Sequence, residues 1–146
     1  ILAWLKRVNT SAAITYTALS TIFSYKNKMA YLRYNDEERK DGISNINILK
    51  VPYVAGGLHY KQDILPDDGR LGLNICLNMK KFELLQTLFH LEKGKFSLSE
   101  KKKSVYVHNF QLKSDKPVIF ECDGETEKSQ YIEISVLPKA IRMLNA

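Results

Sequence analysis

The chain has 146 residues, 45% of them hydrophobic and 26% charged, with a formal net charge of +6. This length and composition are typical of one soluble globular domain with its own core. No apolar run approaches the roughly 18 residues that a membrane-spanning helix needs, and the apolar residues 1–5 precede Lys6 and Arg7, which is the reverse of a secretory signal.

The first 24 residues are expected to be helical. Apolar residues recur there at spacings of three and four, from Ala3 to Phe23. The cap-forming residues 9–11 suggest a break, which would leave a second helix from about residue 11 to 24. The chain has no initiator methionine, so we expect it to be a piece of a longer protein.

Strands are expected to follow this helix. Residues 28–34 alternate in polarity, and the polar residues 35–42 are expected to close that strand with a turn or short loop. A second strand is predicted over 43–51. The alternation over 71–77 is the strongest strand signal in the chain.

One internal helix is expected after these strands. The apolar residues between Phe82 and Leu91 fall on one helical face, with Asn78 as a candidate cap and Gly94 as a candidate stop. Further strands are predicted at about 103–112, 117–122 and 130–137, with Pro138 ending the last.

This order of elements predicts a mainly β (α+β) fold. Helix, strands, helix, strands is not the alternation of a parallel βαβ protein. Short strands joined by turns predict an antiparallel β-sandwich or distorted barrel, with an N-terminal helix and one internal helix packed on it. No repeat divides the chain, so residues 1–146 are expected to form a single domain.

Several classes of site have no signature here. Two cysteines, Cys76 and Cys122, are too few for a disulfide framework and are consistent with a cytoplasmic protein. The three histidines are scattered, which argues against a zinc site. The chain has no Gly-x-x-x-x-Gly-Lys-Ser/Thr, Gly-x-Gly-x-x-Gly or Gly-x-Ser-x-Gly, so it has no phosphate-binding loop of its own and no visible nucleophilic serine.

The positive charge is spread along the chain, as in Lys80-Lys81 and residues 101–103. It is either a solvated surface or an attraction for phosphate, as in a nucleotide or anionic lipid headgroups. No nucleic-acid-binding signature accompanies it.

Two acidic turns are the main candidates for chemistry. The turn Pro66-Asp67-Asp68-Gly69 could donate one carboxylate to a hard cation, with backbone carbonyls completing the shell. The turn Cys122-Asp123-Gly124-Glu125 belongs to a stretch with four acidic residues in seven, a density that suits a general base. Both could instead be ordinary hairpin turns, where Asp-Gly is favoured for its backbone angles.

A glycine pair precedes the first acidic turn. Gly56 and Gly57 permit positive φ or a close approach by another group, which makes them candidate cofactor-binding residues. A β-bulge or tight bend is the structural alternative.

The order of these features resembles the diacylglycerol kinase catalytic family over about residues 11–144. The resemblance rests on the run 47–58, the turn 63–71, Asp123-Gly124-Glu125 and Val136-Leu137-Pro138, with a leading helix that includes residues 18–23. Members of that family are two-domain lipid kinases. The resemblance implies that this chain is the second domain, a β-sandwich, without the Gly-Gly-Asp-Gly-Thr motif of the nucleotide domain.

The resemblance also implies residue roles. Glu125 matches the general base that acts on the lipid hydroxyl, with Asp123 close by. Asp68 matches a structural magnesium ligand, with the backbone oxygens of Leu65 and Arg70 beside it. The chain departs from the family's pattern at Lys50, where asparagine is usual, at Ala55, where a third glycine is usual, and at Arg70, which replaces an apolar residue.

The sequence thus favours a fragment of a lipid kinase, inactive alone, that uses ATP and magnesium and phosphorylates a hydroxyl of diacylglycerol or a similar lipid. The expected partners are the lipid, an anionic membrane surface approached from the cytoplasm, and the protein's own N-terminal nucleotide domain. Homodimer formation stays open. The alternative is a non-catalytic β-sandwich that binds anionic lipid or a protein partner.

Overall fold

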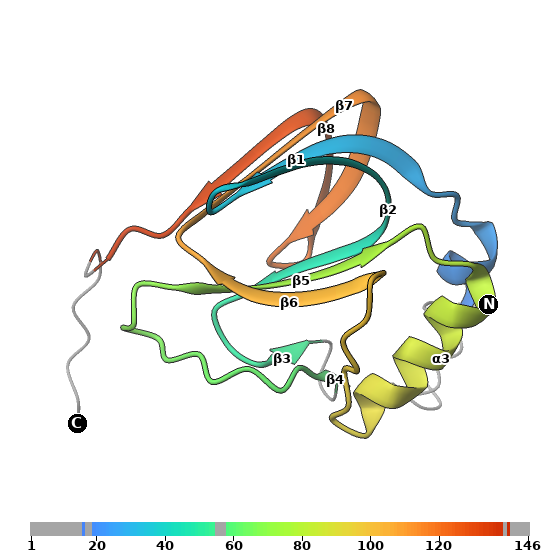
Figure 1. The fold of residues 1–146 in the computed structure, drawn as a ribbon, viewed down its shortest axis with the longest axis horizontal. Helices are drawn as coiled ribbons and strands as arrows, with labels where there is room; N and C mark the ends of the chain where they lie inside the picture. The colour runs from blue at the N-terminus through green and yellow to red at the C-terminus, as the bar shows by residue number, and fades with distance from the viewer. Residues whose placement is uncertain (1–15, 17–18, 55–57, 139, 141–146) are drawn as a thin grey trace.

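The computed structural model describes residues 16, 19–54, 58–138 and 140, and its main element is one antiparallel sheet. Its six strands lie in the order β6-β5-β2-β1-β7-β8, and every neighbouring pair is antiparallel (Figure 1). The strands are β1 (Lys28–Tyr34), β2 (Glu37–Leu49), β5 (Leu71–Leu77), β6 (Lys102–Val107), β7 (Asn109–Cys122) and β8 (Glu125–Ser135). A separate two-stranded ribbon pairs β3 (Tyr53–Val54) with β4 (Leu58–His59).

The sheet becomes a sandwich because β2 belongs to both layers. The first half of β2 pairs with β1 and its second half pairs with β5, with a shift of register between Ile43 and Asn45. Such an irregularity bends a strand and increases its twist. Figure 1 shows β2 curving from the layer of β1, β7 and β8 to the layer of β5 and β6. The predicted mainly β, antiparallel sandwich is therefore confirmed.

The core lies between the two layers. Ala30, Leu32 and Tyr34 point inward from β1, as their alternation predicts, and Leu73 and Ile75 meet them from β5. The inward residues of β7 belong to the same cluster: Phe110, Leu112 and Val118.

Strand β5 is buried on both faces, although its sequence alternates like a half-exposed strand. Asn74 is only 1% exposed, and it donates from Nδ2 to Gln62 Oε1 (2.8 Å) while its Oδ1 accepts from the Ser104 hydroxyl (2.8 Å). A Cβ on Gly72 would lie 2.3 Å from Ile64 Cδ1, so the Ile64 side chain packs directly against the backbone of this glycine. The segment before β5 therefore covers its second face, and burial raises the pKa of the Cys76 thiol there to about 11.

The helices flank one end of the sandwich. Helix α3 (Lys81–Glu92) begins after Lys80 rather than Asn78, and the Lys80 backbone N–H donates to Glu83 Oε2 (2.6 Å). Gly94 follows its end with φ +64°, as its predicted stop role requires. Residues 19–24 are helical, and most of the predicted N-terminal helix lies outside the described residues. No described helix is long and apolar enough to cross a membrane.

Several predicted strand boundaries were wrong. Only Asn35 and Asp36 form the turn predicted over 35–42, because Glu37 and Glu38 already pair with β1. The strands predicted at 103–112 and 117–122 are divided instead at His108, into β6 and a long β7. Pairing across the sheet keeps such polar residues extended, whereas local sequence favours a turn.

Candidate active site

The second acidic turn is the tip of the β7–β8 hairpin. Asp123 and Gly124 form a two-residue turn in which both φ angles are positive, at 51° and 88°. Tight hairpins favour this geometry because it matches the twist of the flanking strands. Glu121 Oε1 accepts from the Gly124 N–H (3.2 Å) and closes the turn. Asp123 thus has a structural reason for its position, whatever its chemistry.

Glu125 lies on the face of the hairpin that continues the core. Glu125 pairs with Cys122 across the hairpin. Further along β8, Glu127 pairs with Phe120 and Ser129 pairs with the buried Val118. Because side chains alternate along a strand, Glu125 points to the same side as Val118, beyond the end of the apolar cluster. The residue is exposed, and neither its carboxylate nor that of Asp123 has a hydrogen bond or ion pair within the described residues. Both carboxylates are therefore available to a ligand.

A bend in the hairpin determines where this tip lies. The register of β7 on β8 shifts between Lys113 and Val118, and the outer half of the hairpin turns away from the straight part in Figure 1. Three side chains bind backbone carbonyls at the bend: Ser114 Oγ to Lys116 O (2.8 Å), Gln130 Nε2 to Asp115 O (2.7 Å) and Lys28 Nζ to Pro117 O (2.8 Å). The position of Glu125 thus depends on residues far from it in sequence.

The first acidic turn uses its carboxylate internally. Asp68 Oδ1 accepts from Lys50 Nζ (2.7 Å) and from the Arg70 N–H (2.9 Å). Its Oδ2 accepts from the Leu65 N–H (3.0 Å) and from Arg70 Nη2 (3.2 Å). The hydrogen bond from Lys50, followed by those from the two backbone amides, holds the pKa of Asp68 well below its usual range.

These contacts do not fit the magnesium ion that the resemblance implies at Asp68. Lys50 Nζ also donates to the backbone oxygen of Arg70 (2.8 Å), so one ammonium group holds the carboxylate and one of the two expected backbone ligands. The backbone oxygen of Leu65 accepts from the Asp68 N–H (3.3 Å). The oxygen atoms that were expected to bind a metal thus already accept hydrogen bonds from the protein itself.

The two acidic turns belong to different parts of the sheet. The Asp68 turn leads into β5, whereas the Glu125 turn joins β7 to β8, and β2 and β1 lie between β5 and β7 in the strand order. No hydrogen bond or ion pair joins the two turns within the described residues. Gly56 and Gly57, the candidate cofactor-binding pair, lie outside the described residues between β3 and β4.

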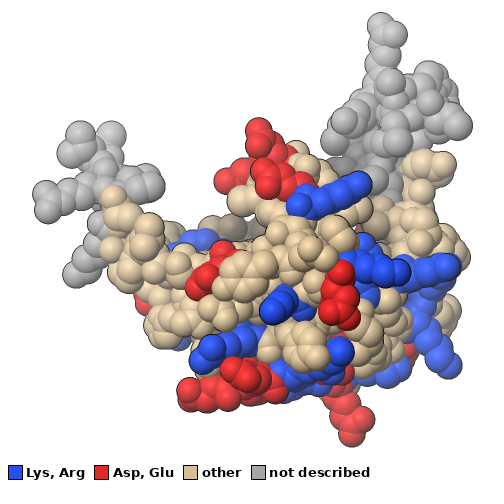
Figure 2. Space-filling view, turned by 90° about the horizontal axis from the view of Figure 1, so that it is seen from above, with Lys and Arg blue, Asp and Glu red and all other residues tan. Residues whose placement is uncertain are grey.

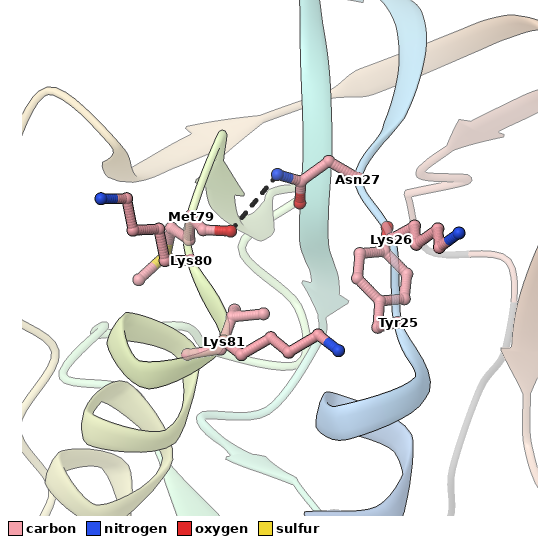
Figure 3. A pocket seen from close by; sticks show the side chains of 7 residues that line it. Tyr25, Lys26, Asn27, Met79, Lys80 and Lys81 are labelled. Atoms are coloured by element: carbon pink, nitrogen blue, oxygen red, sulfur yellow. Dashed lines mark hydrogen bonds between the residues drawn. The ribbon is translucent and has the colours of Figure 1, made fainter.

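A pocket of about 440 Å³ lies where the chain enters β1 and α3 begins (Figure 3). Its lining residues are Tyr25, Lys26, Asn27, Met79, Lys80, Lys81 and Leu84. Asn27 Nδ2 donates to Met79 O (3.3 Å) across it. Lys26 and Lys80 point away from each other in Figure 3, so their charges do not converge on one point. None of the predicted site residues lines this pocket.

Charges of both signs are mixed on the face shown in Figure 2, where lysine and arginine side chains lie beside aspartate and glutamate. Ion pairs among the described residues include Lys101 with Glu83 (2.8 Å) and Lys103 with Glu37 (2.8 Å). Although the chain has a net charge of +6, the basic side chains on this face are interspersed with acidic ones and do not form a continuous patch.

Comparison with known proteins identifies the chain's family. The model of the YegS C-terminal NAD kinase beta sandwich-like domain matches residues 3–145. The chain belongs to this family. The resemblance to the C-terminal domain of the diacylglycerol kinase catalytic family is thereby confirmed, and with it a kinase lineage.

Solved structures agree with this family assignment at the level of the fold. A crystal structure of a "putative diacylglycerol kinase" from Bacillus anthracis superimposes with a TM-score of 0.65 at 17% identity, covering 86% of this chain and 44% of that one. A second structure of that name, from the same organism, has a TM-score of 0.62 at 19% identity, covering 82% and 41%. The YegS-type chain thus spans less than half the length of the solved structures that it matches. No curated protein sequence matches it.

Sequence reasoning missed two features of the site. The ion pair between Lys50 and Asp68 was missed. In the sequence Lys50 was only a departure from the family's usual asparagine, and a separation of 18 residues from Asp68 is too long for a pattern within one helix or strand. The bend of the hairpin was also missed. Pro117 was its one local signal, because proline cannot donate to a ladder and marks irregular strand positions.

Proposed function

We propose that this chain is the second domain of a lipid kinase that transfers the γ-phosphate of ATP to a hydroxyl of diacylglycerol or a similar lipid. Family membership and the names of the solved neighbours support this proposal. Because the chain spans less than half of those neighbours, we assign ATP and its magnesium mainly to an N-terminal nucleotide domain of the same protein. The proposed site of action is the cytoplasmic surface of an anionic membrane.

The observation that carries the proposal is the carboxylate of Glu125, which lies at the tip of a bent hairpin and has no hydrogen-bond or ion-pair partner among the described residues. An exposed glutamate without an internal partner can accept a proton from a bound hydroxyl, whereas a paired one would first have to break its ion pair. Glu125 also lies on the side of the hairpin that continues the core face. A lipid with its chains against apolar surface and its hydroxyl at the tip would meet this carboxylate.

In the proposed reaction Glu125 accepts the proton of the lipid hydroxyl. The hydroxyl oxygen forms a bond to the γ-phosphorus of ATP, the bond from that phosphorus to the β,γ-bridging oxygen breaks, and ADP leaves. Catalysis of this kind depends mainly on positioning and on stabilising the charge of the transferred group. Asp123, one turn residue away, would orient the acceptor. Gly56 and Gly57 remain the candidate cofactor-binding residues.

The test is Glu125→Gln in the full-length protein, assayed for lipid phosphorylation with ATP. Removing a general base is expected to lower turnover at least about 100-fold. Glu121→Gln is the matched control, because Glu121 pairs with Thr126 on the opposite face of the same hairpin. Its turnover should stay within about two-fold of wild type, since an amide oxygen can still accept from the Gly124 N–H.

Near-normal turnover of a folded Glu125→Gln variant would remove the catalytic assignment. The domain would then be better described as a non-catalytic module that binds anionic lipid or a protein partner. Equal losses in both variants would mean that hairpin geometry, rather than the Glu125 carboxylate, limits the reaction.

A further inference from the structure

The Asp68 turn and the end of β2 are joined by a cluster of three charged side chains, Lys50, Asp68 and Arg70. Lys50 follows β2 directly, whereas Asp68 and Arg70 belong to the turn that leads into β5. The Asp68 side chain is only 9% exposed, and those of Lys50 and Arg70 are 33% and 40% exposed. The cluster is therefore partly withdrawn from water, where an unbalanced charge is costly.

The carboxylate of Asp68 has no coordination position left. A carboxylate offers about four lone-pair sites, and four donors occupy them at 2.7 to 3.2 Å. Two of these donors are backbone amides of the same turn, so they cannot move away without unfolding it. A metal ion could enter only by displacing the ammonium of Lys50 or the guanidinium of Arg70.

The position of Lys50 Nζ is that of a bridging cation. It lies 2.7 Å from Asp68 Oδ1 and 2.8 Å from the Arg70 backbone oxygen, a carboxylate and a carbonyl oxygen from the turn. These two kinds of oxygen are the ones that hard cations bind in proteins. An ammonium group can donate to both at once, because it has three hydrogens.

The charge balance disfavours a second cation beside Lys50. With Lys50 and Arg70 each at +1 and Asp68 at −1, the cluster already has a net charge of +1. Arg70 is also held in place, because its guanidinium lies 4.5 Å from the centre of the Tyr106 ring. A divalent ion would face this fixed positive group with a single carboxylate to offset it.

We propose that the Lys50 ammonium is a built-in replacement for a metal ion, so that the link between the end of β2 and the 65–70 turn is independent of divalent cations. The link then needs no exchangeable ligand, and the conformation of this turn is insensitive to the magnesium concentration. Any magnesium requirement of the protein comes from its nucleotide.

The test is thermal unfolding of the full-length protein without nucleotide, in EDTA and in 5 to 10 mM of MgCl₂, about the range that a weak site needs. Wild type and Asp68→Asn are compared, because any magnesium bound elsewhere shifts both equally. The expected result is that magnesium changes the Tm of the two proteins by the same amount, within about 1 °C. A magnesium-dependent rise in Tm that wild type shows and Asp68→Asn lacks would overturn the proposal.

A second pair of variants tests the replacement itself. Lys50→Asn removes the ammonium and supplies a neutral oxygen, so we expect magnesium to raise its Tm by about 3 °C or more. The double variant Lys50→Asn/Asp68→Asn should lose this response. If Lys50→Asn unfolds, the test is isothermal titration of magnesium into wild type and into Asp68→Asn. Magnesium binding that wild type shows and Asp68→Asn lacks would contradict the proposal. Neither readout measures phosphoryl transfer, so the outcome is independent of the proposed kinase activity.

Discussion

Asp68 and Asp123 both stand next to a glycine with positive φ, yet their surroundings differ. The Asp68 turn draws its partners from outside itself, with Lys50 contributed by the end of β2. The Asp123 turn is closed by its own strand, through Glu121, and the carboxylates of Asp123 and Glu125 have no partner among the described residues. A turn whose charge is neutralised internally holds the fold together, whereas one whose charges are left free is available for ligands. Acidic turns that look alike in sequence can therefore have opposite roles.

The largest expected difference between the turns is in stability. Asp68→Asn leaves Lys50 and Arg70 close together without their anion, so we expect it to lower the Tm by about 5 °C. Glu125→Gln should change the Tm by less than about 1 °C, because an exposed side chain without a partner contributes little. Thermal unfolding followed by circular dichroism measures both. A comparable loss in Glu125→Gln would show that its carboxylate has a structural partner after all.

Acid should remove the contribution of Asp68 selectively. The folded-state pKa of Asp68 is depressed, so its stabilisation is fully present above the unfolded-state value of about 3.9 and is lost as pH falls through the folded-state value. The difference in Tm between wild type and Asp68→Asn should therefore be constant from pH 7 to about 5 and shrink steadily below about pH 4. Other carboxylates titrate in both proteins and cancel in the comparison. A difference that is unchanged at pH 2.5 would contradict the assignment.

Substituting alanine for Gly69 or Gly124 should separate the effect of turn geometry on stability from its effect on lipid phosphorylation. Gly69 and Gly124 have φ of 68° and 88°, and nothing lies within 4 Å of a Cβ built on either. Each substitution should therefore cost only the backbone strain, about 1 kcal/mol. Only Gly124→Ala is expected to lower lipid phosphorylation, because it alters the turn that presents Glu125. Denaturant unfolding and the kinase assay measure the two effects, and equal loss of activity in both variants would dissociate activity from the hairpin tip.

The smallest expected effect concerns the bend. Gln130→Ala removes the hydrogen bond to Asp115 O and should cost about 0.5 kcal/mol while lowering turnover several-fold. Gln111→Ala is the control, because Gln111 bonds Glu133 Oε1 (3.1 Å) between the straight parts of the same two strands. It should have a similar effect on stability and none on turnover. If the two variants have the same turnover, the bend does not position Glu125.

Local sequence determined much of the architecture. The alternation in residues 28–34 and 71–77, the helix signal near 82–91 and the Asp-Gly tip at 123–124 all correspond to observed elements. Each of these elements depends on contacts or backbone angles within a few residues, so the local sequence pattern is sufficient to predict it. The order of the motifs also led to the family, with Glu125 and Asp68 as its candidate residues.

Tertiary structure alone decided how these pieces are used. The burial of both faces of β5, the bend of the β7–β8 hairpin, and the ammonium of Lys50 at Asp68 all depend on partners 12 to 89 positions away in sequence. No local pattern specifies such pairs, because loop length costs little free energy and any of many lysines could have reached the turn. The sequence thus identified two acidic turns, and only the fold distinguished the one that is neutralised from the one that is free.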